Sequence, residues 1–309
     1  MNAIDVSGWF IALILLIVLI IGLWLFFYFE LPRYFRMVND PPLYKLDRDY
    51  RQLPRVKVKG RVIITLTSIP DRLNKLDSTL ASLLDQSERV DEIRLNLPRE
   101  SLKGVPYHLP ARFEKLKQVR ICWLDRDWGP STKLLPSIKD EPDAHFIVVD
   151  DDRIYGSRFV ECLTRTYVEH GCRKVVTNYG LYLGEEDWFI SRPFRQLNRA
   201  GRVDHLMGCA GFILCGRMMP PQAFDYDKAP DGAMFVDDNW FSGWLNQAGY
   251  KIIMPEHHSW SDAQGCYYMA NYQDRETLAL CTSENADRIN FDRVDDWFVE
   301  MGAYDYIDV

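Results

Sequence analysis

An apolar run is followed directly by three consecutive carboxylates in the segment Asp143-Ala-His-Phe-Ile-Val-Val-Asp-Asp-Asp-Arg-Ile-Tyr-Gly156. Residues 146–149 are apolar and partly β-branched, which predicts a buried strand of a parallel sheet, and a helix is expected from Ser157 onward. Asp150, Asp151 and Asp152 then stand at the carboxyl end of that strand, the edge where open α/β sheets bind ligands. Three adjacent carboxylates repel one another unless a cation offsets them, and a hard divalent metal is the natural counter-ion. The alternative is an acidic, solvated turn.

Predicted strands and helices alternate along the chain on the amino-terminal side of this segment. Strands are predicted at 61–67, 90–97, 119–123 and 146–149, and helices at 73–84 and 131–138. Such alternation indicates an α/β fold with a mainly parallel sheet.

Composition limits the classes of partner. The chain has 309 residues, of which 47% are hydrophobic, and this content predicts a globular protein with a sizeable core. Its net charge of −7 provides no basic field for nucleic acid, so no nucleic-acid partner is expected. Seven Cys residues lack zinc-binding spacing and are odd in number, which favours reduced thiols.

The amino-terminal region carries an uninterrupted apolar run. Residues 9–29 are long enough for a single transmembrane helix, preceded by a short tail at 1–8, and they lack the features of a cleavable signal peptide. Arg33 and Arg36 follow the run, so the positive-inside rule predicts a membrane protein whose large domain faces the cytoplasm. A Golgi or endoplasmic-reticulum lumenal placement is the alternative.

The segment at 30–59 is rich in Pro and charged residues and is predicted to be a stem, lying along the membrane or against the domain. The catalytic-size domain is expected to span 60–309.

Several motifs together resemble those of a known family. They are Thr67-Ser-Ile-Pro-Asp-Arg72, Ile93-Arg-Leu-Asn-Leu-Pro98, Gly129-Pro-Ser-Thr-Lys-Leu-Leu135, the Asp150 to Asp152 triad and Val236-Asp-Asp-Asn-Trp240. In this order, over roughly residues 60–260, they resemble the GT-A-fold, family-2-like glycosyltransferases. The resemblance implies a Rossmann-like, mixed and mainly parallel sheet flanked by helices. It also implies a UDP- or GDP-sugar donor, a carbohydrate-containing acceptor, and Mn²⁺ or Mg²⁺ as cofactor.

The resemblance also implies roles for individual residues. Asp150 would approach the nucleotide ribose, and Asp152 would bind the metal that carries the donor diphosphate, as in the DxD motif. The candidate donor-binding residues are Thr67, Ser68, Asp71, Arg72, Lys133, Asp150 and Asp151. For the residues after the first strand, ordinary turn and helix-capping chemistry is the alternative. For Lys133, which follows a Gly-Pro turn at a probable helix start, the alternative is a solvated surface lysine.

The acidic pair Asp237 and Asp238 occupies the place of the family's E-D motif, with Asp237 replacing Glu and Asp238 in the position of the catalytic base. One base is enough to deprotonate an acceptor hydroxyl, so an inverting transfer is expected. Alternatively, both carboxylates only complement the dipole of the helix that they begin. His257 and His258 are further candidate metal ligands, or exposed residues at the end of a strand.

Two other regions are candidate ligand contacts. Tyr179, Tyr182, Trp188 and Phe189 could stack on a carbohydrate acceptor or form a satellite core. Small residues at 208–216 permit close backbone approach by a ligand or by a neighbouring element of the fold, and the resemblance favours a ligand, near the transferred sugar.

Two functions from other classes remain open. A phosphohydrolase would need an acidic nucleophile at the end of the first strand, where this chain has Thr67-Ser-Ile-Pro. A non-catalytic carbohydrate-binding or scaffold protein is the second alternative.

Overall fold

The computed structural model describes residues 6–28, 30–181, 201–255, 268–270 and 286–304. His257, His258, Tyr182, Trp188 and Phe189 therefore lie outside the described residues.

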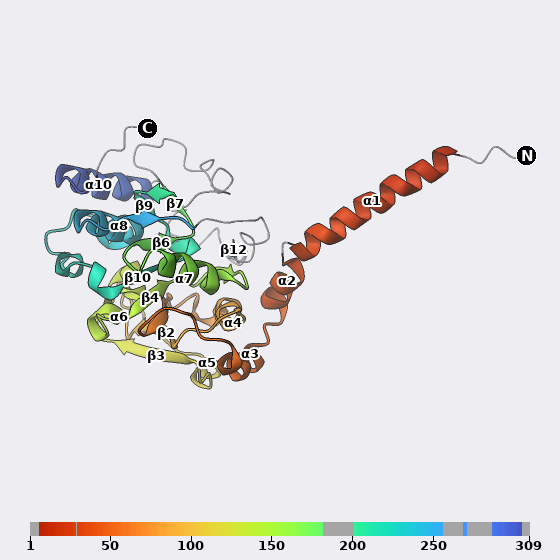
Figure 1. The fold of residues 1–309 in the computed structure, drawn as a ribbon. Coiled ribbons are helices and arrows are strands. Elements are labelled where there is room, and N and C mark those ends of the chain that lie inside the picture. Colours follow the sequence, from red (N-terminus) through yellow and green to blue (C-terminus); the bar gives the residue numbers. More distant parts are fainter. Residues whose placement is uncertain (1–5, 29, 182–200, 256–267, 271–285, 305–309) are drawn as a thin grey trace, which may run out of the picture.

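A mixed, mainly parallel sheet forms the centre of the domain (Figure 1). Its strands lie in the order β3-β2-β1-β4-β10-β6-β11-β8. The first four are mutually parallel, β10 is antiparallel to both of its neighbours, β11 is parallel to β6, and β8 is antiparallel to β11. In this order the strands span Val119–Leu124, Glu92–Pro98, Val62–Thr67, His145–Val148, Phe212–Cys215, Val175–Thr177, Ile252–Ile253 and Arg202–Val203. The expected α/β class with a mixed, mainly parallel sheet flanked by helices is confirmed.

The four predicted strands all form; β1, β2 and β4 are buried at nearly every position, whereas β3 lies at the edge of the sheet and is only partly buried. Val62, Ile63, Ile64 and Leu66 of β1 have no exposed surface, and neither do Phe146, Ile147 and Val148 of β4. Thr65 of β1 pairs with Val148 of β4, so the two strands end side by side.

Helices flank this sheet (Figure 1). Among its described residues, the domain has the α-helices α4 (Asp77–Leu84), α5 (Ala111–Glu114), α6 (Leu135–Asp140), α7 (Phe159–Glu169), α8 (Asp237–Gln247) and α10 (Ala286–Glu300). Gly249 after α8 has φ +80°, the left-handed conformation expected of a glycine that ends a helix.

Two predicted helices are interrupted. The segment at 73–84 forms a 3-10 turn, η2 (Leu73–Lys75), followed by α4, and the segment at 131–138 forms η3 (Gly129–Lys133) followed by α6. Pro136 explains the second break, because it has no N–H to donate to the carbonyl of Thr132 four residues earlier. That carbonyl instead accepts a hydrogen bond from Asn96 Nδ2 at 3.1 Å.

Two small sheets were not anticipated. Strand β5 (Arg153–Tyr155) begins directly after the Asp triad and pairs antiparallel with β12 (Tyr268–Ala270). Strands β7 (Gly180–Leu181) and β9 (His205–Leu206) form the other pair. Each strand is only two or three residues long, too short to show a period in the sequence.

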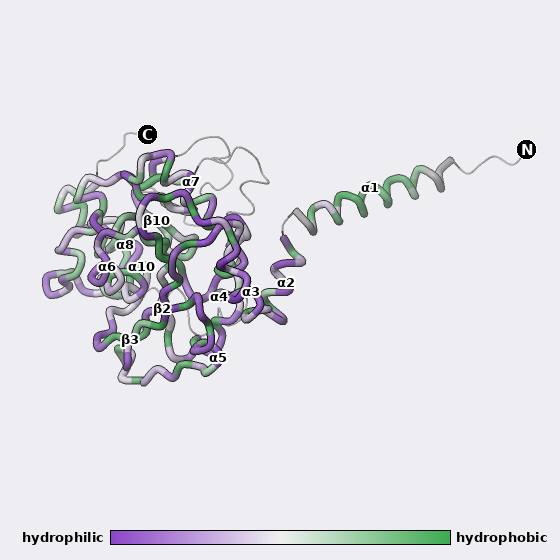
Figure 2. Tube along the Cα trace, turned by 60° about the horizontal axis from the view of Figure 1, so that its bottom comes forward, coloured by the Kyte–Doolittle hydropathy of each residue, from purple (hydrophilic) through white to green (hydrophobic). Residues whose placement is uncertain are grey.

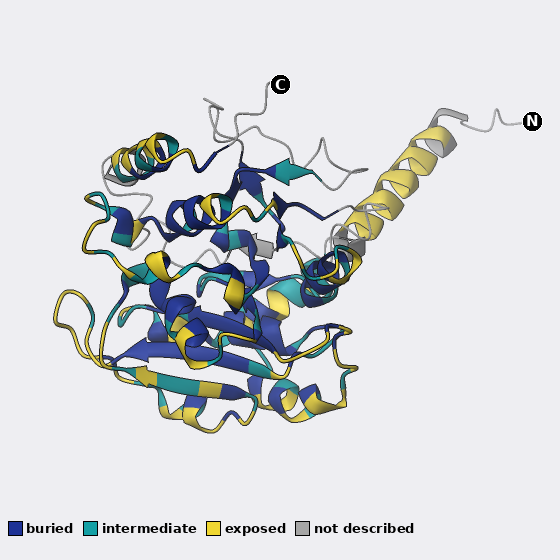
Figure 3. Cartoon of the chain, turned by 60° about the vertical axis from the view of Figure 1, so that its left-hand side comes forward, coloured by how far each residue is buried: buried dark blue, intermediate teal, exposed yellow. Residues whose placement is uncertain are grey.

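The amino-terminal helix α1 (Val6–Tyr28) projects away from the domain (Figure 1). Apolar residues run along it, and its described side chains, at 10–25, are exposed (Figures 2 and 3). Within the described part of the chain, no helix is both long and apolar enough to cross a membrane. The membrane span predicted at 9–29 is therefore not confirmed.

The segment predicted as a stem lies against the domain, one of its two expected placements. It contains α2 (Leu31–Asn39), α3 (Leu43–Asp49) and the turn η1 (Tyr50–Gln52), and Met37 of α2 is fully buried. Arg33 donates to Asp85 Oδ2 at 2.8 Å and to the carbonyl of Tyr155 in β5, also at 2.8 Å. The charge of Arg33, on which the predicted membrane orientation was partly based, is thus paired within the domain.

The carboxyl-terminal helix α10 covers the outer face of α8. Trp297 stacks on Trp240 with ring centroids 5.7 Å apart, and Phe298 is fully buried against the same helix. At Gly243 of α8 the helices approach so closely that a Cβ atom would lie 2.2 Å from the Phe298 ring.

Replacing Gly243 by Ala should therefore destabilise the protein by about 1–3 kcal/mol, because a methyl group is forced into a packed interface. Chemical denaturation measures the free energy of unfolding. In the Phe298→Ala background the clash is absent, so the same substitution should cost nothing or stabilise α8 through the helix propensity of Ala. Equal costs in both backgrounds would contradict this contact.

Candidate functional site

The acidic residues singled out in the sequence gather with Lys133 at one edge of the sheet. Asp150 to Asp152 follow β4, Ser68 follows β1, Asp237 and Asp238 begin α8, and Lys133 ends η3. The fold thus brings segments from four parts of the chain together where the parallel strands end.

Lys133 lies among three carboxylates. Its Nζ is 2.7 Å from Asp150 Oδ1, 2.8 Å from Asp237 Oδ2 and 3.9 Å from Asp238 Oδ1, and its side chain is only 6% exposed. Burial disfavours the charged ammonium, but the attraction of the three carboxylates outweighs it and raises the pKa of Lys133 well above its ordinary value. Lys133 is therefore a permanent cation, and the alternative of a solvated surface lysine is wrong.

Asp238 combines partial exposure with a strongly shifted pKa. Its Oδ2 accepts a hydrogen bond from the backbone N–H of Gly208 at 2.9 Å, and its side chain is 22% exposed against 10% for Asp237. Burial, followed by repulsion from Asp237, raises the pKa of Asp238 to about 8, although Lys133 opposes this shift. Burial also raises the pKa of Asp237. Asp238 is thus the more accessible carboxyl group and one that takes up a proton near neutral pH.

The three residues of the triad have different surroundings. Asp151 is buried, accepts a hydrogen bond from Ser68 Oγ at 2.5 Å and lies 3.1 Å from Arg72 Nη2, and burial raises its pKa to about 6. Asp150 has a lowered pKa, because attraction to Lys133 outweighs burial. Asp152 has a 34% exposed side chain and lies 3.2 Å from Arg72 Nη1. Asp151 therefore anchors the turn, and Asp152 is its most exposed carboxylate.

Arg72 links the first βα turn to the triad through both ion pairs, and its own side chain is 24% exposed. Thr67 donates to the carbonyl of Asn96 at 2.8 Å, while Asp71 is exposed. Neither η2 nor α4 has a side-chain cap at its start, so these polar residues do not serve as helix caps.

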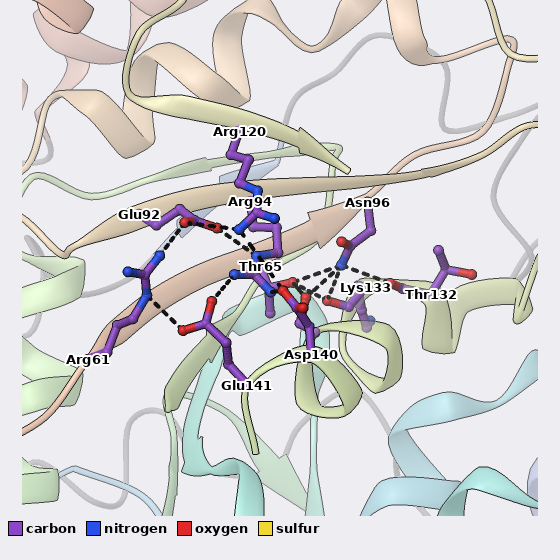
Figure 4. A network of polar contacts seen from close by, with 11 residues as sticks. Arg61, Thr65, Glu92, Arg94, Asn96, Arg120, Thr132, Lys133, Asp140 and Glu141 are labelled. Atoms are coloured by element: carbon purple, nitrogen blue, oxygen red, sulfur yellow. Dashed lines mark hydrogen bonds and ion pairs between the residues drawn. The ribbon is translucent and has the colours of Figure 1, made fainter. Parts of the chain in front are cut away.

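A buried polar network holds Lys133 from its backbone side (Figure 4). Thr65 Oγ1 of β1 donates to the carbonyl of Lys133, and Asn96 Nδ2 of β2 donates to Ser137 Oγ at 2.9 Å. Asn96 Nδ2 also reaches the carbonyl of Thr132, the acceptor that Pro136 leaves without a helical hydrogen bond. Sequence reasoning missed Thr65 and Asn96, although each is a polar residue inside an apolar strand, which is a usable signal.

A second part of this network lies farther along β2, where Arg94 is almost fully buried (Figure 4). It lies 2.6 Å from Glu92 Oε1 and 3.1 Å from Asp140 Oδ2. These ion pairs tie the end of α6 to the sheet and so help to fix η3.

The residues present fit a divalent metal of the kind that the resemblance implies. Among the described residues, no three His, Cys, Asp or Glu side chains are placed so that they could together hold a metal ion. Mg²⁺ and similar ions, however, are commonly held by one or two carboxylates and completed by substrate phosphates. Oδ1 of Asp152 is buried and accepts no hydrogen bond within the described structure, but it lies 3.3 Å from Arg153 Nε, so a metal bound there would compete with this ion pair.

No protein-family model and no curated protein sequence matches this chain. Among solved structures it is similar to S. aureus TarS, with 12% sequence identity and a TM-score of 0.48. The likeness covers 80% of this chain and 41% of that chain, so the protein spans less than half the length of TarS.

Proposed function

We propose that the protein is a metal-dependent glycosyltransferase that moves a sugar from a nucleotide-sugar donor to a carbohydrate-containing acceptor. One observation carries this proposal. Asp238, a partly exposed carboxyl group with its pKa raised to about 8, lies at the same edge of the sheet as the Asp150 to Asp152 triad. A transferase of this kind needs a base and an acidic donor motif side by side.

In the proposed reaction Asp238 takes the proton of the acceptor hydroxyl. The bond from the acceptor oxygen to the anomeric carbon forms as the bond from that carbon to the diphosphate oxygen breaks, which inverts the configuration. The Gly208 N–H and the Lys133 ammonium hold the carboxyl group in place. A base whose pKa lies near the working pH is well matched to this proton transfer.

The donor would lie over the ends of β1 and β4. We propose that Thr67, Ser68 and Asp71 contact the nucleoside and that Asp150 and Asp152 hold Mn²⁺ or Mg²⁺. When bound, the metal would offset the charge of the departing nucleoside diphosphate. Arg72, held between Asp151 and Asp152, adds a fixed positive charge beside that group.

The two rival functions gain no specific support. The residues after β1 are Thr67 and Ser68, so a phosphohydrolase would lack an acidic nucleophile there. A scaffold would not require a carboxyl group whose charge is disfavoured at neutral pH. The cytoplasmic placement of the domain stays a prediction, which protease protection in sealed membranes would test.

The raised pKa of Asp238 predicts the pH dependence of the reaction. Below about pH 8 the carboxyl group holds a proton and cannot act as a base, so kcat/KM should rise with pH and level off above about 8. Initial rates at subsaturating acceptor between pH 5 and 9.5 measure this profile. A profile that is already flat above pH 5 would mean that Asp238 has an ordinary pKa or is not the base.

A transfer assay tests the proposed function itself. The protein is incubated with UDP- or GDP-sugars, Mn²⁺ and a panel of glycan and glycolipid acceptors, and both nucleoside diphosphate release and sugar incorporation are measured. Metal-dependent incorporation with one nucleotide class is the expected result. Binding of glycans with no donor turnover, in the presence of Mn²⁺ or Mg²⁺, would support the carbohydrate-binding alternative instead.

A further inference from the structure

Residues from several separate elements contact Lys133. Its ammonium faces Asp150 from the end of β4 and both Asp237 and Asp238 from the start of α8. Its carbonyl is held by Thr65, and the carbonyl of the preceding Thr132 is held by Asn96. The backbone of the residue is thus held by buried side chains, and its ammonium faces the buried Asp237 and the partly exposed Asp150 and Asp238.

The backbone of Gly208 packs closely against the ammonium and against Asp238. A Cβ atom at Gly208 would lie 2.5 Å from Asp238 Oδ1 and 2.7 Å from Lys133 Nζ, so the backbone of residue 208 closes the cluster. Asp238 Oδ1 is buried and accepts no hydrogen bond from the described residues, and it lies 3.9 Å from the Lys133 ammonium. The position of Asp238 therefore depends on the charge of Lys133 and on the Gly208 N–H.

Three carboxylates around one cation is an arrangement that proteins ordinarily build for a divalent metal. Here the chain supplies the cation itself, as a primary ammonium group at hydrogen-bonding distance from Asp150 and Asp237. Without it, these carboxyl groups from two separate elements would repel one another at the edge of the sheet whenever they are ionised.

We infer that Lys133 is a positioning residue that takes the place of a divalent cation, joining the donor motif at Asp150 to the acidic pair at Asp237 and Asp238. This role differs from the donor contact that the sequence suggested for Lys133. The roles of Asp150, Asp237 and Asp238 in sugar transfer rest on the proposed function. The role of Lys133 as a substitute for a cation does not depend on it.

The inference predicts that removing the ammonium creates a metal site. Lys133→Ala leaves a cavity lined by three carboxylates, and the variant should bind one more Mn²⁺ per chain than its parent, as measured by calorimetry. The comparison is made in the Asp152→Asn background, so that the proposed donor-linked metal does not contribute. Ethylammonium, which replaces the lost group, should raise the melting temperature of the variant.

Two controls separate this role from general packing. Lys133→Met fills the cavity without a charge and should gain neither Mn²⁺ nor ethylammonium binding. Lys139→Ala removes an exposed lysine of α6 and should also gain neither. A folded Lys133→Ala variant that binds no additional Mn²⁺ and ignores ethylammonium would overturn the inference.

A double-mutant cycle covers the case in which Lys133→Ala does not fold. In the Lys133→Met background, Asp237→Asn removes one of the repelling carboxylates and should raise the melting temperature. In the wild-type background, the same substitution breaks the ion pair with Lys133 and should lower the melting temperature. Equal shifts in both backgrounds would overturn the inference. None of these measurements uses sugar transfer, so an inactive wild type would contradict the proposed function and leave this test intact.

Discussion

Replacing Asp152 by Asn is expected to reduce sugar transfer by roughly 10²-fold or more and to remove the metal-dependent part of donor binding. The substitution keeps the shape of the side chain and removes the charge that a hard cation needs. A metal that offsets developing charge contributes several kcal/mol to the stabilisation of a transition state, and each 1.36 kcal/mol corresponds to about a factor of ten in rate. Transfer rates and nucleotide-sugar affinity, each with and without Mn²⁺, measure the effect.

Asp143 provides the matched control for Asp152. It precedes β4 at the opposite end of the same strand, where it is 73% exposed and paired with Arg217. Asp143→Asn should therefore leave transfer and donor affinity unchanged. If Asp152→Asn keeps the Mn²⁺ dependence of the wild type, the metal is held elsewhere.

The second large effect is expected at Asp238. Asn cannot accept a proton at neutral pH, so Asp238→Asn should lower the transfer rate by roughly 10²-fold or more. Nucleotide-sugar affinity should stay almost unchanged, because the base faces the acceptor and not the donor. If Asp238 only complements the dipole of α8, the variant should lose about 0.3–1 kcal/mol of stability and remain active. Turnover and donor affinity, measured together, separate the two roles.

Asp237→Asn is the comparison for this variant. Asp237 has a 10% exposed side chain and pairs with Lys133 at 2.8 Å, so its loss should affect stability and the position of its neighbours. The pH profile of any residual activity distinguishes the two residues, since only a variant that lacks the base should lose the rise toward pH 8. Near-normal turnover of Asp238→Asn would move the base assignment to Asp237.

Strands β1 and β4, at the centre of the sheet, could be predicted because they are mostly apolar and buried on both faces. Segments such as Val62-Ile-Ile-Thr-Leu-Thr67 are buried at nearly every position, and such runs are recognisable without knowledge of their partners. Strand β5 could not be predicted in this way, because its partner β12 lies more than a hundred residues away in the sequence. The break between η3 and α6 was readable in principle from Pro136.

The candidate site also has some features that the sequence predicts and others that it does not. The triad and the acidic pair are visible as charges at the ends of apolar elements, and the fold brings both to one edge. The contact of Lys133 with Asp150, Asp237 and Asp238 was not predictable, because it depends on the relative placement of β4, η3 and α8. The same is true of the hydrogen bond from the Gly208 N–H to Asp238, which joins residues thirty positions apart.

A thermal-shift experiment with nucleotide sugars tests the proposed function most directly. Wild-type protein and Asp152→Asn are melted with UDP- and GDP-sugars, each with and without Mn²⁺. The proposal predicts that one nucleotide class raises the melting temperature of the wild type only when Mn²⁺ is present, and that Asp152→Asn loses this shift. A wild-type protein that no nucleotide sugar stabilises, or a shift that Asp152→Asn retains in full, would contradict it.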